Sequence, residues 1–349
     1  MMKKKRWILP VVIFVLLVIV INSLLNYMLV QPGLSRTIFH ESEAGDYDCI
    51  IVGASHGSYG YVPEDIENAT GMKTMNMCIG GEYLNDSYYV LKYALKFNKP
   101  SMVILDVDYQ YLVNQHDESI LFNSVYNAYP ACKEKIGYYF SKMVKEEYRG
   151  TFLRWTNYWQ CYKTIGETVK KKQSEAYKNY DASVVSMNPY DTYKGQGFIY
   201  RSTDYKKSTT PCIEWDEKKV DSGQVDYIKK IVELCRKNNI DIVFTSAVQD
   251  PEMVGHLADK FDGADVYIQK LADELSVDYY NFNKLSFQLF DRDTDDFYDR
   301  EGHMYGSTAT AFSQIVGELL SKRADGTLKV SDYLEDSIKE MYSNIEFTW

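Results

Sequence analysis

The chain has 349 residues, a formal net charge of −10 and an ordinary hydrophobic content of 45%. This length fits one large domain or two modest ones. The acidic balance argues against nucleic acid as a partner, because binding to phosphates requires a basic face. Anionic lipids would also repel such a chain, so any membrane attachment must come from apolar residues.

The N-terminus has the pattern of a membrane anchor. Residues 3–6 are Lys-Lys-Lys-Arg, and an uncharged stretch over 7–30 follows them. At about 1.5 Å per residue this stretch can cross a hydrocarbon core of roughly 30 Å. It ends without the small-residue cleavage site of a signal peptide, which favours an uncleaved helix. The basic tail, residues 1–6, is therefore predicted to be cytoplasmic, with a stalk over 31–46 and the C-terminal body outside the membrane.

Residues 47–325 alternate between short apolar runs and stretches with helical spacing. Such alternation predicts an α/β fold, a three-layer α/β/α sandwich with a mostly parallel sheet, of the flavodoxin-like kind. A break in one helix is expected at Gly263. The expected strands are 48–52, 73–78, 102–107, 240–245 and 277–282, and the expected helices are 63–69, 85–97, 225–236, 253–275 and 307–320.

An irregular region over about 109–222 interrupts this alternation. It is rich in Tyr, Trp, Lys and Asn, and contains a helical pattern over 133–145. We interpret it as an insertion on the rim of the sheet and not as a separate domain. Its aromatic residues either form a platform for a glycan or a partner, or simply pack the insertion, which is the favoured interpretation. The tail, 326–349, is expected to form an amphipathic helix over 331–347.

The six cysteines are scattered and form no C-x-x-C motif. No zinc site is therefore expected, and we predict neither a metal nor another cofactor. Cys49 and Cys78 lie in strand-like apolar runs, where buried free thiols are expected. Cys132, Cys161 and Cys212 are the candidates for disulfide pairing if the body lies outside the membrane.

Ser55 is the first candidate for chemistry. It lies in the sequence Ile-Val-Gly-Ala-Ser-His-Gly over 51–57, just after a predicted strand. The carboxyl ends of parallel strands are where α/β sheets present reactive groups. The alternative is a serine that only caps the next helix. The neighbouring His56 is expected to direct its side chain away from that of Ser55.

His303 is the second candidate, in the segment 297–306 directly before the last predicted helix. A serine hydroxyl needs a nearby base to become a nucleophile, and the base needs a carboxylate that fixes its tautomer. Asp299 lies four residues earlier on the same loop and could fold back onto His303. Ser55, His303 and Asp299 are thus the predicted catalytic residues.

A glycine-containing segment, Gly-Gly-Glu-Tyr-Leu-Asn over 80–85, follows the second predicted strand. Backbone N–H groups at Gly81 and the side-chain amide of Asn85 could stabilise an oxyanion there. The alternative is an ordinary glycine loop without a role in chemistry.

Together these segments resemble the SGNH (GDSL-like) hydrolase superfamily, in which a Ser follows the first strand, a Gly the second, and a late Asp/His pair precedes the last helix. The resemblance is closer to the membrane-anchored DltD-like and polysaccharide O-acyltransferase-associated group. Residues 76–81 (Asn-Met-Cys-Ile-Gly-Gly) and 99–104 (Lys-Pro-Ser-Met-Val-Ile) carry this part of it. The resemblance covers about residues 47–322, without most of the insertion.

The chain departs from that family at two points. The late motif is usually Asp-x-x-His, whereas Asp299 is one residue too far back, so Glu301 or Asp296 could take its place. The third family block, often Gly-x-Asn-Asp, is replaced by Asp106-Val107-Asp108. An ionised Asp cannot donate to an oxyanion, so this pair is expected to bind a substrate amine or hydroxyl, or only to cap the strand end.

The resemblance implies acyl-ester chemistry at the outer face of the cell membrane. The implied acceptor is a cell-envelope polysaccharide or teichoic acid, the implied acyl group is D-alanyl or acetyl, and the implied partner is a membrane-bound O-acyltransferase. Transfer and hydrolysis use the same residues and are left open. The competing interpretation is a non-catalytic protein with an SGNH fold that binds or assembles components of an acylation complex.

Overall fold

The computed structural model describes residues 7–113, 120–142, 149–203 and 213–343. Its contacts divide the chain into two compact units. One comprises residues 1–37 and 118–186, and the other comprises residues 38–117 and 187–349. The expected insertion therefore contributes to both units: its central part groups with the N-terminal helix, and its two ends group with the sheet.

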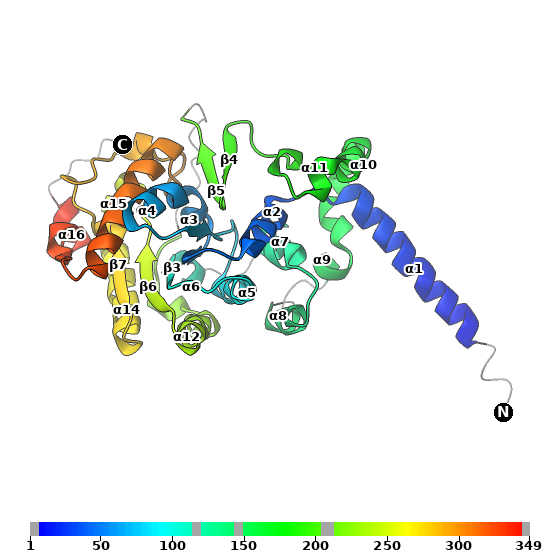
Figure 1. Ribbon diagram of the computed structural model, residues 1–349, viewed down its shortest axis with the longest axis horizontal. Helices are drawn as coiled ribbons and strands as arrows, with labels where there is room; N and C mark the ends of the chain where they lie inside the picture. Colours follow the sequence, from blue (N-terminus) through cyan, green and yellow to red (C-terminus); the bar gives the residue numbers. More distant parts are fainter. Residues whose placement is uncertain (1–6, 114–119, 143–148, 204–212, 344–349) are drawn as a thin grey trace. The chain divides into compact units, whose positions relative to one another are not determined.

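The second unit is built on a five-stranded sheet (Figure 1). All neighbouring strands are parallel, in the order β2-β1-β3-β6-β7. This is the flavodoxin-like order of a doubly wound sheet. The predicted fold class is confirmed, and each expected strand is present: β1 (Cys49–Val52), β2 (Thr74–Asn76), β3 (Met102–Asp106), β6 (Asp241–Ser246) and β7 (Asp278–Asn281).

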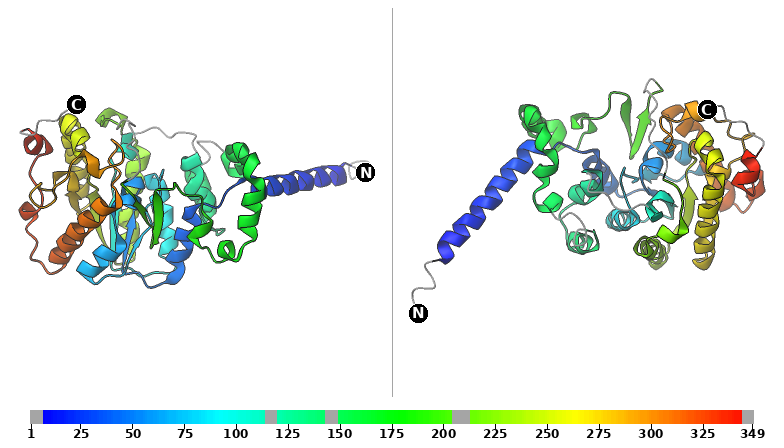
Figure 2. Two further views of the ribbon diagram at one scale, coloured as in Figure 1. Left: turned by 90° about the horizontal axis from the view of Figure 1, so that it is seen from above. Right: turned by 180° about the vertical axis from the view of Figure 1, so that it is seen from behind.

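Helices cover both faces of this sheet (Figures 1 and 2). On the face that carries α15 (Gly306–Ala324), strands and helices pack around a core that includes Ile51, Ile104, Phe312 and Val316, all fully buried. This is called the first face below. Right-handed crossovers place the helices that follow β2, β3 and β6 on the opposite face. The first face carries α3 (Ser55–Gly60), α4 (Pro63–Thr70) and α15 (Gly306–Ala324), and the other carries α5 (Leu84–Ala94), α12 (Ser222–Lys237) and α14 (Ala258–Glu274).

The predicted helix over 253–275 is broken, but not at Gly263. The break is at Leu257, whose φ of −104° and ψ of 24° separate α13 (Pro251–His256) from α14. Gly263 instead lies inside α14 against the Trp215 ring, where a Cβ atom would come within 3.1 Å of Trp215 Cδ1. The glycine thus permits close packing of an aromatic ring.

Of the predictions for the two ends of the body, the single long C-terminal helix was wrong. The expected stalk forms α2 (Leu34–Glu41) and η2 (Ser42–Ala44), and buries Phe39 against the edge of Tyr93. The expected long C-terminal helix is replaced by η8 (Val330–Asp332) and α16 (Ile338–Tyr342), while residues 344–349 lie outside the described residues. Asp262 accepts hydrogen bonds from the backbone N–H groups of Ile338 and Lys339, which fixes the tail to α14.

A β-hairpin from the region predicted as an insertion belongs to the unit that contains the sheet. Its strands, β4 (Asp191–Gly195) and β5 (Phe198–Arg201), are antiparallel. Between them Gln196 accepts a hydrogen bond from Asn76 N–H at 2.9 Å, and Gly197 has a φ of +86°. A Cβ atom at Gly197 would collide with Asn76 O, so only glycine lets the hairpin approach the end of β2. Further short elements here are α6 (Gln110–Val113), η5 (Glu217–Lys219), η6 (Phe282–Lys284) and η7 (Thr294–Asp296).

The first unit is helical. Its N-terminal helix, α1 (Ile8–Leu29), is long and apolar enough to cross a membrane. The predicted helix over 133–145 is present as α8 (Glu134–Lys142), and its last residues lie outside the described part. The remaining elements are α7 (Ile120–Ala128), α9 (Arg149–Phe152), η3 (Arg154–Thr164), α10 (Ile165–Gln173), α11 (Glu175–Lys178) and η4 (Ala182–Val184).

The cysteines of the described residues are free thiols. Cys49 and Cys78 are buried, as the sequence predicts. Cys132 and Cys161, proposed for pairing, are also free, and Cys212 lies outside the described residues.

Candidate active site

Ser55 is placed at the centre of the sheet's carboxyl edge. It is the first residue of α3 and follows β1, which lies between β2 and β3. Because the chain leaves β1 and β3 toward opposite faces, this is the switch point at which doubly wound sheets bind ligands. Gly53 and Gly57 allow the tight approach: a Cβ atom at Gly53 would lie 2.8 Å from the Cβ of Asp106, and one at Gly57 would lie 2.4 Å from Cys78 Sγ.

The three residues predicted to be catalytic form one continuous hydrogen-bonded chain. Ser55 Oγ lies 2.7 Å from His303 Nε2, and His303 Nδ1 lies 2.8 Å from Asp299 Oδ2. Asp299 Oδ1 also accepts hydrogen bonds from the backbone N–H groups of Gly302 and His303, which fold the loop back on itself. The arrangement is that of a nucleophile, a base and an acid that orients the base.

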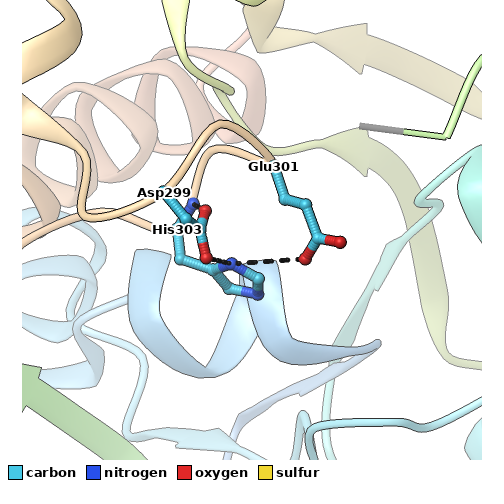
Figure 3. A group of neighbouring side chains, drawn as sticks. All are labelled: Asp299, Glu301 and His303. Atoms are coloured by element: carbon cyan, nitrogen blue, oxygen red, sulfur yellow. Dashed lines mark hydrogen bonds and ion pairs between the residues drawn. The ribbon is translucent and has the colours of Figure 1, made fainter. Parts of the chain in front are cut away.

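Of the three acids that the sequence left open, Asp299 holds the position beside His303. Asp296 instead accepts hydrogen bonds from Thr308 and from the backbone of Asp293. Glu301 lies on the other side of the imidazole, with Oε2 3.9 Å from Nδ1 (Figure 3). Asp299 and His303 are separated by three residues and not by the two of Asp-x-x-His. The turn at Gly302, whose φ is +98°, accommodates the additional residue.

The surroundings favour a neutral His303 and a charged Asp299. Burial lowers the pKa of His303, and the nearby charge of His56 lowers it further, against the effect of Asp299. Burial by itself would raise the pKa of Asp299, but hydrogen bonds and charge from His303 hold it below its ordinary value. A neutral imidazole with a fixed tautomer is the state that a general base requires.

His56 is part of the site, although the sequence predicts that its side chain turns away from Ser55. Its Nδ1 lies 2.6 Å from Asp108 Oδ2, and its Nε2 lies 2.8 Å from the carbonyl oxygen of Glu301. Both ring nitrogens therefore face acceptors, which requires the doubly protonated imidazolium. Burial opposes the charge, but Asp108 outweighs it and the pKa of His56 rises to about 9.

The two imidazoles stack. Their ring centroids are 4.5 Å apart, with an angle of 24° between the planes. Consecutive residues of a helix diverge by about 100°, so Ser55 and His56 do leave α3 in different directions. The loop over 299–303 wraps around the start of α3 and reaches both side chains. This wrapping is a long-range feature with no local signal in the sequence.

Asp299, Glu301 and His303 place carboxylate oxygens and an imidazole nitrogen within 4.8 Å of one another, a spacing that suits a metal ion (Figure 3). The imidazole atom in this group is Nδ1, which also contacts Asp299. If Nε2 accepts the proton of Ser55, Nδ1 must carry hydrogen and cannot ligate a metal. The hydrogen-bonded chain to Ser55 thus accounts for these residues without an ion.

The two acids after β3 have different positions. Asp108 is the partner of His56. Asp106 is fully enclosed and accepts hydrogen bonds from the Tyr61 hydroxyl and the backbone N–H of Ala247. Burial and the charge of Asp108 raise the pKa of Asp106 to about 6. These contacts assign Asp106 to the end of the strand, as in the capping alternative, and make Asp108 a support for the histidine pair.

The glycine loop lies beside Ser55, and the contact is made by Gly80. A Cβ atom at Gly80 would lie 3.8 Å from that of Ser55. Gly81 forms the turn, with a φ of +78°. Asn85 is buried on α5, and its Oδ1 has no hydrogen-bond partner among the described residues. The structure therefore brings the backbone of this loop to Ser55, whereas no described contact joins Asn85 to Ser55.

Tyr111, which the sequence did not single out, reaches the nucleophile. It lies on α6 after β3, and its hydroxyl is near enough to the Ser55 side chain for an interaction that opposes the rise in the Tyr111 pKa caused by burial. Its ring contacts Tyr83 edge-on with centroids 4.9 Å apart. A phenol at such a position can donate to an oxyanion.

The hairpin β4–β5 supplies a cation to the wall of the site. Arg201 forms a two-point ion pair with Asp191 and stacks on the Tyr298 ring, with its guanidinium carbon 3.7 Å from the ring centroid. Tyr298 in turn stacks on His303 at 5.2 Å, and Tyr59 meets His303 edge-on at 5.8 Å. The His303 imidazole is therefore packed against three rings, those of Tyr298, Tyr59 and His56.

Comparisons with known proteins add little to this geometry. No family model matches the chain. No curated protein matches it either. Among solved structures, a "putative acylhydrolase" from Bacteroides fragilis aligns over 80% of this chain and 88% of its own, with 8% identity and a TM-score of 0.35. A likeness at this level says nothing about the activity, and the functional inference depends on the residues around Ser55.

Proposed function

We propose that this chain is an SGNH-like serine enzyme that cleaves or transfers acyl esters. The observation that carries the proposal is the continuous hydrogen-bonded chain from Ser55 through His303 to Asp299. Ser55 and His303 are 248 positions apart in the sequence. Together with Asp299 they meet in the geometry that acyl transfer requires. A serine that only capped a helix would have no need for the other two.

In the proposed first step, Ser55 Oγ attacks the ester carbonyl carbon while His303 Nε2 takes the hydroxyl proton. Asp299 holds the proton on Nδ1 and stabilises the imidazolium that forms. The tetrahedral intermediate collapses, the C–O bond to the alcohol breaks, and His303 returns the proton to the departing alkoxide. The acyl group remains on Ser55 until water or a second hydroxyl attacks it through the same base.

The oxyanion of that intermediate is proposed to bind the hydroxyl of Tyr111 and backbone N–H groups at Ser55 and Gly80. The first N–H groups of an α-helix have no partner within the helix, and Ser55 begins α3. Gly80 faces Ser55, since a Cβ atom added to it would lie 3.8 Å from that of Ser55. These donors take the place of Gly81 and Asn85, for which the described residues give no such contact with Ser55.

The finer substrate assignment follows from the family resemblance. We propose that the enzyme acts outside the membrane on D-alanyl or acetyl esters of a teichoic acid or another cell-envelope polysaccharide. A membrane-bound O-acyltransferase is the proposed partner. The apolar helix α1 supports membrane anchoring by its length and composition. Transfer is favoured over hydrolysis if a glycan hydroxyl competes with water for the acylated Ser55.

A fluorophosphonate probe tests the proposal directly. The full-length chain in detergent should be labelled covalently at Ser55, because the probe reacts only with a serine activated by a base. Ser55→Ala should abolish the labelling, and Ser101→Ala is a matched control on the amino-terminal side of the sheet. Labelled peptide identified by mass spectrometry would give the position.

The contrary outcome is also informative. If the folded wild-type chain resists the probe and releases no acetate or D-alanine from model esters, the catalytic proposal fails. The non-catalytic alternative, a binding or assembly protein with the same fold, would then be preferred. A near-ultraviolet circular dichroism spectrum with the signals of fixed aromatic side chains would show that the tested sample is folded.

A further inference from the structure

Two asparagines near the end of α1 are bonded to a distant part of the chain. Asn22 donates to the carbonyl oxygen of Phe152 at 2.8 Å and accepts from Trp155 Nε1 at 3.1 Å. Asn26 accepts from the backbone N–H of Trp155 at 2.9 Å. All of these residues belong to the first unit. Away from water a polar group must find a partner within the protein, and both side chains have one.

The length of the part of α1 that no other segment covers indicates how deep in a membrane these contacts would lie. Residues 8–21 are all exposed, whereas coverage of the helix begins at Asn22. At about 1.5 Å per residue the free part spans only about 21 Å. A hydrocarbon core is roughly 30 Å thick. If α1 crosses a membrane, the contacts at Asn22 and Asn26 must therefore lie at or inside the lipid–water boundary.

The segment that packs against α1 carries large exposed aromatic side chains. Phe152 is 58% exposed, Trp159 is 64% exposed and Tyr162 is 54% exposed. Residues three apart share a face of a 3₁₀ helix, so Trp159 and Tyr162 lie together on η3, next to the face that holds Trp155. Aromatic rings of this kind concentrate at membrane–water boundaries, where one end is apolar and the other wet.

Basic side chains accompany this aromatic surface. Lys163 and Lys170 are exposed, and Lys172 donates to the carbonyl oxygens of Asn26 and Tyr27 at the end of α1. Cations at the C-terminal end of a helix offset its negative dipole. Long lysine side chains also reach from an apolar boundary to phosphate headgroups. The charge of this surface is thus opposite to that of the acidic chain as a whole.

We propose that residues 149–173 form a collar around the end of α1 that is embedded in the lipid–water boundary. Phe152, Trp159 and Tyr162 contact the outer edge of the acyl chains, and the lysines contact the headgroups. The occupant of this aromatic surface is therefore the bilayer itself. The collar fixes the depth and tilt of the anchor, and it is independent of the ester chemistry at Ser55.

Tryptophan quenching by lipid tests the collar. The full-length chain is reconstituted in phosphatidylcholine vesicles, with or without bromine near the start of the acyl chains. Trp159→Phe is compared with wild type, and Trp215→Phe, which removes a buried tryptophan of the other unit, is the matched control. The emission lost on substitution of Trp159 should be blue-shifted, quenched by brominated lipid and protected from aqueous iodide.

The other outcomes overturn the proposal. Emission from Trp159 that is quenched by iodide and not by bromine would show that the surface faces water. Emission protected from both quenchers would show that protein, such as a second copy of the chain, covers it. The Trp215 emission should resist both in every case. If Trp159→Phe disturbs folding, Tyr162→Trp in the otherwise wild-type chain repeats the measurement one turn further on, and its added emission should be quenched by brominated lipid and protected from iodide.

Discussion

In the unit that contains the sheet, polar side chains gather at the end of β1 and bond mainly to one another. In the unit that contains α1, the polar side chains Asn22 and Asn26 bond to a single segment around Trp155. The first arrangement places the proposed nucleophile, base and acid in one hydrogen-bonded line. The second holds residues 152–155 against the end of α1 through side chains that are only partly buried. A buried polar contact is costly to leave unmade, and the contacts at the end of β1 are both buried and aligned for proton transfer.

The largest loss of activity is expected when Asp299, the acid of the hydrogen-bonded chain, is replaced. Asp299→Asn should lower kcat/KM for a model acetate ester by about a thousandfold or more, because the amide favours the wrong tautomer of His303. Steady-state kinetics would measure the loss. Asp296→Asn is the matched control and should change kcat/KM only a few-fold, since Asp296 bonds to Thr308 and Asp293. Equal losses in the two variants would contradict the assignment of Asp299.

Tyr111→Phe should have the next largest effect. Removal of a single donor to an oxyanion lowers kcat by roughly a hundredfold. The KM should change little, because the donor acts mainly on the transition state. Tyr88→Phe, on the neighbouring helix α5, is a control that should leave kcat unchanged. An unaltered kcat in Tyr111→Phe would assign the oxyanion to backbone groups alone.

His56→Gln should move the pH dependence more than the maximal rate. A positive neighbour disfavours protonation of His303, so its loss should raise the pKa of His303 and shift the acid limb of kcat/KM upward, by about half to one unit. Activity should therefore fall more at pH 6 than at pH 8. In wild type the acid limb should lie below 6.5, the ordinary pKa of histidine. A pH profile that coincides with wild type would show that the stacked cation has no influence on the base.

The smallest effect is expected in the other unit. Asn22→Leu removes the partner of the Trp155 indole, and one such hydrogen bond contributes about 1 kcal/mol. Hydrogen exchange at the Trp155 indole in lipid vesicles should accelerate several-fold, while esterase activity stays unchanged. Ser23→Ala is the control, since the hydroxyl of Ser23 bonds only locally, to Ile19. A loss of activity in Asn22→Leu would show that the two units are energetically coupled.

Part of the site could be predicted because its signals are local. Ser55 directly follows a short apolar strand, and His303 directly precedes the last helix, so the rules of α/β sheets bring both to one edge. Asp299 was within reach on the same loop. The divergence of the His56 side chain from Ser55 could be predicted, but its contact with Glu301 and its stacking on His303 could not, because adjacency in sequence says nothing about a loop that arrives from residue 299 onward. Tyr111 gave no signal at all, since its role depends on where a short helix after β3 comes to lie.

The same limit applies at the two ends of the body, where local patterns did not predict the short elements that form. Apolar residues over 34–44 have the spacing of a helix, but only Tyr93 and the hairpin give them something to pack against. The tail after 330 forms short pieces because Asp262 and the Leu285–Leu334 bridge hold it to the domain. Local propensity is a weak preference, and tertiary contacts override it.

The sequence by itself predicted the parallel sheet, the apolar N-terminal helix and the pairing of Ser55 with His303, but it left Asp296, Asp299 and Glu301 open as the acid. These follow from periodicity, composition and the order of elements, which are local or nearly local properties of a chain. Only the tertiary structure decided the charge on His56, the approach of Tyr111 to Ser55, the aromatic wall around His303 and the division of residues 109–222 between two units. Each of these depends on contacts between distant segments, and their geometry is fixed only when the whole core has packed.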